Sequence, residues 1–529
     1  MPKFPGIRGF FLDEVPLLRQ SSRGVRGVSI PDCGLKKTGL KKDEGAYINK
    51  KFIRKDPPNL PEVSEPSVVR HFTRLSSWNM CVDSVFYPLG SCTMKYNPKI
   101  NEKIAGLENI KNIHPETPSF LIQPLLKIIH DFNCILCELT GLAEFSFAPQ
   151  AGAAGEFAGL KIIKKYFDMK GKNRKKILVP DSSHGTNPAS SVLAGFTPVE
   201  IKTGNAGTLA AEALEKYISK DVAGIMITNP NTFGIFEKDI RKISDIMHKN
   251  GSFVYMDGAN FNAFLGNARV SDMGIDIIQL NLHKTFSTPH GGGGPGSGAI
   301  GVVESLKEYL PVPYVKAVIK SGANVKSGVV DNGHIKQDIK GAIKAKGLKS
   351  GSGLFYVTAA DKKYTIGRMA PFLCSFAVLV RAYAYLLSLG KNNIGSVSEI
   401  AVLNANYVKK KLAKILQGSD PFEEGLCMHE CVFNDKAIEE SGVSTLELAK
   451  LLIDYGFHPP TVYFPKNIHG AIMIEPTETE SIRTIDSFIK AVEEIKFKVK
   501  KSRAVKSPQK TKIGRVNEVL ANKKPVFKY

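Results

Sequence analysis

Lys284 is the residue with the clearest chemical potential in this chain of 529 residues. It follows an apolar, strand-like run at 275–280 and precedes a glycine-rich stretch at 290–298. A lysine at the end of a buried strand, beside backbone that a ligand can approach closely, indicates an amine held in a pocket. Such amines form Schiff bases with carbonyl compounds, pyridoxal phosphate (PLP) foremost among them. The alternative is a surface lysine ahead of a flexible loop.

Three other segments carry groups that a PLP site needs. Residues 150–156 (QAGAAGE) run into a predicted helix start, where backbone N–H groups and the helix dipole favour a phosphate. Asp257, after a predicted strand, could keep the pyridine nitrogen protonated, and His184, in a loop, could stack on the ring. Each also has an ordinary explanation as a tight helix start, a turn or helix cap, or a structural histidine.

The order of these four features along the chain favours the cofactor. A glycine-rich helix start, a histidine, an aspartate and a lysine, each after its own strand, is the order found in fold-type I PLP enzymes. The sequence therefore predicts that Lys284 binds PLP. A dinucleotide-binding fingerprint at 291–296 is the competing pattern, but Pro295 and the lack of a helix start after it argue against that use.

Short apolar runs alternate with helical patterns from about residue 140. Strands are expected at 145–147, 176–179, 223–227, 253–256 and 275–280, and helices at 155–167, 239–249, 372–389, 396–416 and 481–499. This alternation predicts an α/β fold with a mostly parallel sheet covered by helices on both faces. Polar residues gather where the strands end, which is where open α/β sheets bind ligands.

Four regions are expected along the chain. Residues 1–75 form an N-terminal extended arm, and 76–374 form a large PLP-binding domain with an inserted basic loop at about 316–350. A smaller C-terminal α+β domain covers 375–502, and a basic tail covers 503–529.

Composition fits an ordinary globular protein, with 43% hydrophobic and 23% charged residues. No run approaches the ~18 apolar residues of a membrane span, and Asp13 and Glu14 argue against a signal or transit peptide. A cytoplasmic protein without membrane association is expected. Eight cysteines are spread along the chain, and Cys134-x-x-Cys137 has no second pair at zinc-finger spacing, so free thiols and no metal are expected.

The net charge of +22 is compatible with nucleic acid or an acidic protein as partner. The sequence contains no helix-turn-helix pattern, RNP signature or cysteine/histidine finger, so we expect no nucleic-acid binding. Lysines concentrate at 316–349 and 496–512, and we expect each of these regions to form a charged surface exposed to solvent.

Six longer motifs resemble those of a known family. They are YPLGSCTMKYNP at 87–98, DSSHGTNP at 181–188, DGAN at 257–260, NLHKTFSTPHGGGGPGSG at 281–298, HPPTVYFP at 458–465 and EPTETE at 475–480. In these the chain resembles the glycine decarboxylase P-proteins of the glycine cleavage system, specifically subunit 2 of the two-subunit prokaryotic form. Residues 1–12 resemble an extension of that pattern, and about twenty residues within 316–350 resemble an insertion.

The resemblance implies a fold-type I PLP-dependent transferase fold with a seven-stranded sheet, and it implies specific site residues. Lys284 would hold PLP as a Schiff base, with Asp257 on the pyridine nitrogen. His184 would stack on one face of the ring and Ala259 would pack on the other. The phosphate would be bound with the help of Ala153 and Ala154, with His283 and Thr285 close by, and the substrate channel would be lined by Ser91, Cys92 and Thr93.

The resemblance also implies a reaction and partners. The enzyme would be a glycine dehydrogenase (aminomethyl-transferring) that decarboxylates glycine, releases CO2 and passes the aminomethyl group to the lipoyl arm of an H-protein. The family's two-subunit form is an α2β2 heterotetramer with a subunit 1, so we expect little activity from this chain alone. H-proteins of the family are acidic, so the positive charge could steer their approach.

Two other functions stay open on the sequence. The chain could be another fold-type I PLP lyase or an aminotransferase, for which Arg368 is a candidate to bind the substrate carboxylate. It could also be a basic binding protein without enzymatic activity.

Overall fold

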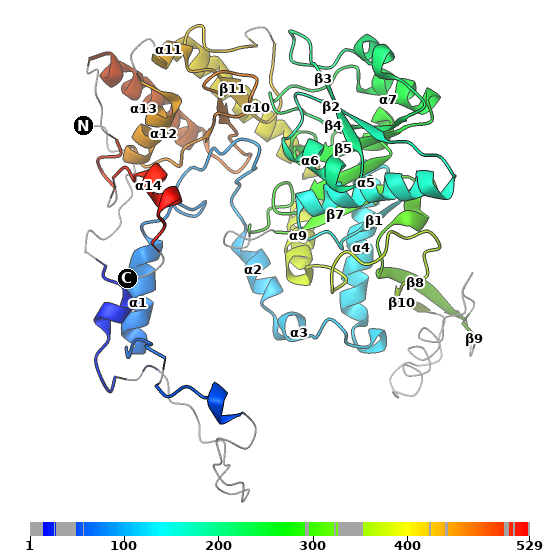
Figure 1. The fold of residues 1–529 in the computed structure, drawn as a ribbon, viewed down its shortest axis with the longest axis horizontal. Coiled ribbons are helices and arrows are strands. Elements are labelled where there is room, and N and C mark those ends of the chain that lie inside the picture. Colours follow the sequence, from blue (N-terminus) through cyan, green and yellow to red (C-terminus); the bar gives the residue numbers. More distant parts are fainter. Residues whose placement is uncertain are drawn as a thin grey trace, which may run out of the picture.

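A computed structural model describes most of the chain. The described residues are 14–25, 27, 49–56, 58–290, 296–321, 324–325, 353–422, 425–439, 443–501, 507–511 and 514–526. Figure 1 shows a large sheet with helices on both faces, and a smaller unit beside it that contains the C-terminal helices α12 and α13.

The large sheet has seven strands in the order β1-β7-β6-β5-β4-β2-β3. Five neighbouring strands are parallel, whereas β7 runs antiparallel to β6 and to β1. The prediction of a mostly parallel seven-stranded sheet is confirmed. The strands are β1 (Glu144–Ser146), β2 (Lys176–Pro180), β3 (Thr197–Ile201), β4 (Val222–Thr228), β5 (Phe253–Gly258), β6 (Ile277–Asn281) and β7 (Gly298–Val302).

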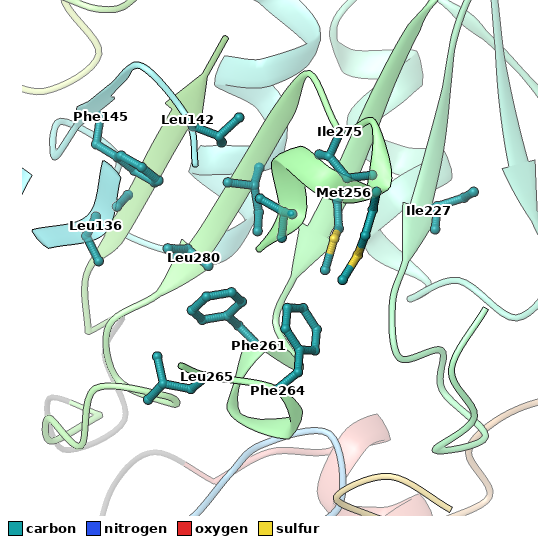
Figure 2. Close-up of a cluster of buried hydrophobic side chains, with 14 of the residues drawn as sticks. Leu136, Leu142, Phe145, Ile227, Met256, Phe261, Phe264, Leu265, Ile275 and Leu280 are labelled. Atoms are coloured by element: carbon teal, nitrogen blue, oxygen red, sulfur yellow. The ribbon is translucent and has the colours of Figure 1, made fainter. Parts of the chain in front are cut away.

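Buried side chains alternate between the two faces of this sheet. On β4, Ile225 and Ile227 pack with one apolar cluster while Met226 packs with the other. Figure 2 shows the first face, where Leu280, Met256 and Ile227 from neighbouring strands lie near Phe261 and Phe264. This face is covered by α4 (Gln123–Thr140), α7 (Ile240–Lys249) and α9 (Phe376–Leu389). The other is covered by α5 (Gly152–Met169), and α6 (Thr186–Leu193) contacts α5, β2 and β3.

Three glycines of α5 face β5 and β6, and at these positions there is little or no room for a side chain. A Cβ on Gly159 would lie 2.4 Å from the Tyr255 ring, and one on Gly152 would lie 2.5 Å from Asn281 Nδ2. A Cβ on Gly155 would lie 3.0 Å from Gln279 Cβ. The helix starts at Gly152, three residues before the predicted start, and its first turn lies beside the end of β6.

The smaller unit has its own antiparallel sheet, with β13 (Ile472–Ile474) between β11 (Cys431–Phe433) and β12 (Thr461–Val462). Its apolar core also contains residues of α12 (Thr445–Asp454) and α13 (Ile482–Lys501), together with Phe86. Helix α9 packs instead with the core of the large sheet, so no change of core occurs at the boundary expected near residue 375. Helix α10 (Ile394–Ile415) contributes to both cores.

The N-terminal region is helical at its end, where the sequence suggested an extended arm. Residues Glu65–Ser76 form α1, which stands away from the large sheet (Figure 1). Ser64 caps this helix, and its last turn pairs with an earlier segment through Arg74 and Glu14. The short helices α2 (Lys99–Ala105) and α3 (Glu108–Lys111) lead from there to α4.

The expectation of a loop over 316–350 is wrong at its start. Residues Tyr314–Ser321 form β8, which pairs along its length with β10 (Gly353–Ala359) and at its end with β9 (Asn324–Val325). The physical reason is that β8 has apolar residues on both faces. Val315 and Ala317 pack against the core of the large sheet, whereas Val318 packs with Phe355 and Val357. Residues 322–323 and 326–350 of the expected loop lie outside the described residues.

Part of the basic tail docks on the smaller unit. The backbone N–H groups of Gln509 and Lys510 donate to the carboxylate of Asp454 at 2.7–2.9 Å. Farther along the tail, α14 (Glu518–Lys523) is capped by Asn517. The smaller unit also contains the short helix α11 (Lys436–Glu439), whose Ala437 and Ile438 lie in its core. Within the described residues, none of the helices combines the length and apolar character that a bilayer crossing requires.

Replacing Gly159 by alanine should destabilise the large domain. Alanine normally favours a helix, but here the added methyl group meets a fully buried tyrosine ring, and such overpacking costs about 1–3 kcal/mol. We expect a lower urea midpoint for Gly159→Ala by circular dichroism. Gly514→Ala, where nothing lies within 4 Å of the new Cβ, is the matched control. Equal midpoints for the two variants would contradict this account of the α5 contact.

Candidate functional site

The site residues gather at the carboxyl ends of parallel strands, as open α/β sheets favour. Asp257 is the next-to-last residue of β5, and Lys284 follows β6 by three residues. His184 follows β2, and its backbone N–H donates to Thr228 Oγ1 at the end of β4 at 3.3 Å. The structure thus brings together the three residues that the sequence order singled out.

Lys284 is buried, with 8% of its surface exposed. Its ammonium donates to the backbone carbonyl of Ser91 at 2.8 Å. This contact crosses from the end of β6 to a segment almost two hundred positions earlier in the chain. The amine is therefore held inside the protein by a neutral acceptor, with no direct ion pair among the described residues.

Asp257 is almost fully buried and accepts three hydrogen bonds. Asn187 Nδ2 donates to it at 3.2 Å, Gln279 Nε2 at 2.5 Å and the backbone N–H of Ala259 at 3.0 Å. These three donors fix the orientation of the carboxylate. A carboxylate at this depth suits a protonated ring nitrogen, and the bond from Ala259 fixes that residue beside it.

His184 is joined to a buried glutamate through a threonine. Its Nδ1 lies 2.9 Å from Thr186 Oγ1, which donates to Glu156 Oε1 at 2.8 Å, and Ser190 donates to the other oxygen at 2.9 Å. Burial lowers the pKa of His184 below its usual value, so a neutral imidazole is favoured at neutral pH. Burial, followed by the nearby Asp257 charge, raises the pKa of Glu156 to about 7. Sequence reasoning assigned no role to Glu156, although its motif was singled out.

The start of α5 and the residues around Lys284 offer donors to an anion. The residue before the helix, Ala151, provides no side-chain cap, and Ala153 and Ala154 lie in the uncapped first turn. Thr285 Oγ1 is buried without a hydrogen-bond partner in the described structure. His283 Nδ1 lies 3.2 Å from the carbonyl of Ser297, and burial, then the nearby His290 and Lys284, lower its pKa to about 4.

The segment Ser91–Thr93 is held by two buried glutamates of the smaller unit. Ser91 N–H donates to Glu430 Oε2 at 2.7 Å, and Thr93 N–H donates to Glu475 Oε2 at 2.9 Å. The Thr93 hydroxyl also donates to Glu475. Cys92 lies between Ser91 and Thr93 in the chain, and burial raises the pKa of its thiol. Glu475 belongs to a motif recognised in the sequence, but no sequence signal marks Glu430.

Together these residues fit PLP. An uncapped helix start and the unpartnered Thr285 hydroxyl suit its phosphate. Asp257 suits its ring nitrogen, and the buried amine of Lys284 suits its aldehyde. Arg368, the candidate for an aminotransferase, is exposed and donates to the carbonyl of Pro371. Residues 291–295 of the glycine-rich stretch lie outside the described residues.

A cleft of about 520 Å³ opens beside His184. Its walls come from the ends of β2 and β3 and from residues 464–467 of the smaller unit, and Lys202 and Lys466 are among its lining residues. The rings of His184 and Phe464 lie 5.8 Å apart at one side of it. The cleft thus leads from the surface to one member of the site.

Known proteins resemble this chain in sequence and in fold. Two family models match, "Glycine cleavage system P-protein" over residues 42–317 and "Glycine dehydrogenase, C-terminal domain" over 397–517. The probable glycine dehydrogenase (decarboxylating) subunit 2 of Kosmotoga olearia is 46% identical over 97% of this chain and 99% of that protein. Its namesake from Pyrococcus abyssi is 47% identical over 92% of this chain and 91% of that protein.

Solved structures with low sequence identity share the fold. The glycine decarboxylase (P-protein) of the glycine cleavage system, in inhibitor-bound form, has a TM-score of 0.68 at 17% identity and covers 87% of this chain and 97% of its own. The cysteine desulfurase of Thermococcus onnurineus NA1 has a TM-score of 0.56 at 15% identity, covering 79% and 96%. The fold is thus the fold-type I fold of PLP-dependent enzymes, and the chain belongs to the glycine cleavage system P-proteins, as a glycine dehydrogenase (decarboxylating) subunit 2.

Proposed function

We propose that Lys284 holds PLP, and that with it the enzyme decarboxylates glycine and passes the aminomethyl group to the lipoyl arm of an H-protein. The observation that carries this proposal is the pairing of a buried amine with a buried, triply hydrogen-bonded carboxylate at neighbouring strand ends. PLP, when bound, supplies the electron sink that makes loss of CO2 from an amino acid feasible.

The residues of this chain then have separate tasks. Asp257 would accept from the protonated ring nitrogen, because its three donors hold the carboxylate in one orientation. His184, as a neutral imidazole, and Ala259 would lie against the two faces of the ring. The first turn of α5 and the hydroxyl of Thr285 would hold the phosphate. The amine of Lys284 would bind the aldehyde and could carry a proton near the reacting carbon.

The proposed partners follow from the surface and from the relatives. The curated relatives are named as a subunit 2, which implies a partner subunit. We propose that this partner is a subunit 1 in an α2β2 assembly, and that the cleft beside His184 admits the lipoyl arm. Lys202 and Lys466 line that cleft, and the chain carries a net charge of +22, so an acidic H-protein would be attracted.

Replacing Lys284 by alanine should abolish covalent attachment of PLP. Borohydride reduction of the wild-type holoenzyme, followed by peptide mapping, should place the pyridoxyl label on Lys284, and Lys284→Ala should lose both the label and the visible Schiff-base absorbance. Lys202→Ala, a surface change of the same type, should retain both. A label on any other lysine would overturn the assignment.

Replacing Asp257 by asparagine should lower the rate while PLP still binds. The amide keeps the shape but removes the charge that stabilises a protonated ring, and loss of one such electrostatic partner costs about 100- to 1000-fold in kcat. Glycine-dependent CO2 exchange with H-protein measures this rate. Asp276→Asn is the control, because this half-buried carboxylate pairs with His248 at the opposite, amino-terminal ends of β5 and β6. An Asp257→Asn enzyme with wild-type kcat would exclude the proposed role.

Electrostatic steering predicts that the KM for H-protein rises with ionic strength, because salt screens charges separated by more than a Debye length. Lys466→Glu at the cleft should raise this KM further at low salt, whereas Lys249→Glu on α7 should change it little. A KM that stays constant across salt concentrations would exclude steering.

A further inference from the structure

Two buried glutamates face each other beside the site. Strands β11 and β13 pair with Cys431 opposite Ile474, so the next position sets Glu430 opposite Glu475. Their exposed fractions are 0% and 1%. Like charges directly opposite each other on neighbouring strands destabilise a sheet, and two carboxylates sharing a buried site do not both ionise readily.

Both glutamates hold one short turn of the chain. Glu430 accepts from the N–H of Ser91, and Glu475 accepts from the N–H and hydroxyl of Thr93. Ser91 and Thr93 have φ angles of 64° and 42°, a left-handed conformation that costs energy, particularly in a β-branched residue. The carboxylates offset that cost. The same turn presents the Ser91 carbonyl to the ammonium of Lys284 at 2.8 Å.

The charges around the pair do not balance two ionised carboxylates. The titratable groups near it are Lys284, Cys92, Cys427, Cys431, His429 and Glu478, and burial keeps the Cys427 and Cys431 thiols neutral by raising their pKa values. Glu478 is already paired with Lys95 at 2.7 Å. His429 is fully buried with neither ring nitrogen hydrogen-bonded in the described structure, and burial lowers its pKa to about 3, so it adds no positive charge. Lys284 is therefore the only cation among these groups, and it forms no direct ion pair with a carboxylate in the described residues.

The pKa directions agree with this arrangement. Burial, then the charge of Glu475, raises the pKa of Glu430 well above its usual value. Burial also raises the pKa of Glu475 to about 7, against the bonds from Thr93. Glu430 Oε1 has no protein partner in the described structure, which leaves it free to carry a hydrogen.

A bound metal ion is the other explanation for a histidine and two glutamates whose ligand atoms lie within 4.8 Å of one another. The hydrogen bonds favour a proton instead. Both oxygens of Glu475 and one of Glu430 already accept from Ser91 or Thr93, so only His429 and Glu430 Oε1 stay available to an ion.

We propose that Glu430 and Glu475 share one proton, and that the resulting singly charged pair positions the Ser91–Thr93 turn and, through the Ser91 carbonyl, the amine of Lys284. The pair touches the turn and acts on Lys284 through it, so these glutamates are positioning residues. This inference rests on the proposed function only in taking Lys284 as the amine that binds PLP.

The first test is the pH dependence of stability in the cofactor-free protein. A carboxyl whose pKa is raised on folding adds stability below its unfolded value of about 4.5, and loses it as pH rises through about 7. The wild-type unfolding temperature should therefore fall as the pH rises from about 5 to 8. In Glu430→Gln one carboxylate of the pair is neutral at every pH, so the fall should be smaller. A fall as steep as in wild type would overturn the shared proton.

The second test is the rate at which the cofactor-free protein captures added PLP, followed by the Schiff-base absorbance. Glu430→Gln and Glu475→Gln keep an acceptor for the turn and should stay near the wild-type rate at pH 7. Glu475→Ala loses both bonds to Thr93, and Thr93→Val loses the hydroxyl bond while the backbone bond stays. Misplacement of the amine should slow capture at least about tenfold in Glu475→Ala, and to a smaller extent in Thr93→Val. Glu480→Gln is the control, because burial raises its pKa to about 7 as well, yet no hydrogen bond joins its side chain to the turn in the described structure.

The outcomes separate this inference from the proposed function. If Lys284→Ala captures PLP as the wild type does, the proposed function fails. If capture requires Lys284 but Glu475→Ala and Thr93→Val both capture at the wild-type rate, the positioning role fails alone. Should Glu475→Ala not fold, Thr93→Val and the pH profile of Glu430→Gln decide the matter. A stoichiometric metal in the purified wild type that is lost in Glu430→Gln would also overturn the shared proton.

Discussion

The close contact between α5 and the sheet is the constraint on which the site depends. Gly152, Gly155 and Gly159 remove the side chains that would keep the helix away from β5 and β6. With side chains at these positions, the first turn of α5 would lie farther from the end of β6, where Lys284 follows. Small residues in this helix therefore set the distance between an anion-binding helix start and the reactive amine, besides allowing dense packing.

A second constraint comes from the smaller unit. The turn at Ser91–Thr93 does not belong to the large sheet, yet its carbonyl is the direct hydrogen-bond partner of Lys284. The turn is held from the opposite side by Glu430 and Glu475, which extend strands of the smaller sheet. The amine thus lies between two sheets, and its placement depends on both of them.

Sequence reasoning reached the parts of the site that follow strong local patterns. Lys284, Asp257 and His184 each come after a predicted strand, and the parallel arrangement then brings strand ends together. It missed β7 because Gly298–Val302 continues a glycine-rich stretch that resembles a loop, and β3 because Pro198 and Glu200 interrupt its apolar pattern. The sequence did not mark Glu430 as a site residue, because its position opposite Glu475 depends on pairing between strands that are distant in the chain. The segment after Tyr314 was misjudged because its lysines hid the apolar residues on both faces of β8.

Helix α10 joins the two cores in one continuous element. Val397 near its start packs with the core of the large sheet, whereas Ala405, Val408 and Leu412 pack in the smaller one. Its 22 residues span about 33 Å, and an unbroken helix of that length resists bending. Because the helix is continuous, the smaller unit cannot tilt relative to the large sheet without disturbing the packing of α10 in the core of that sheet. Helix α10 therefore helps to fix the position of the two sheets relative to each other, and with it the position of the groups around the Lys284 amine.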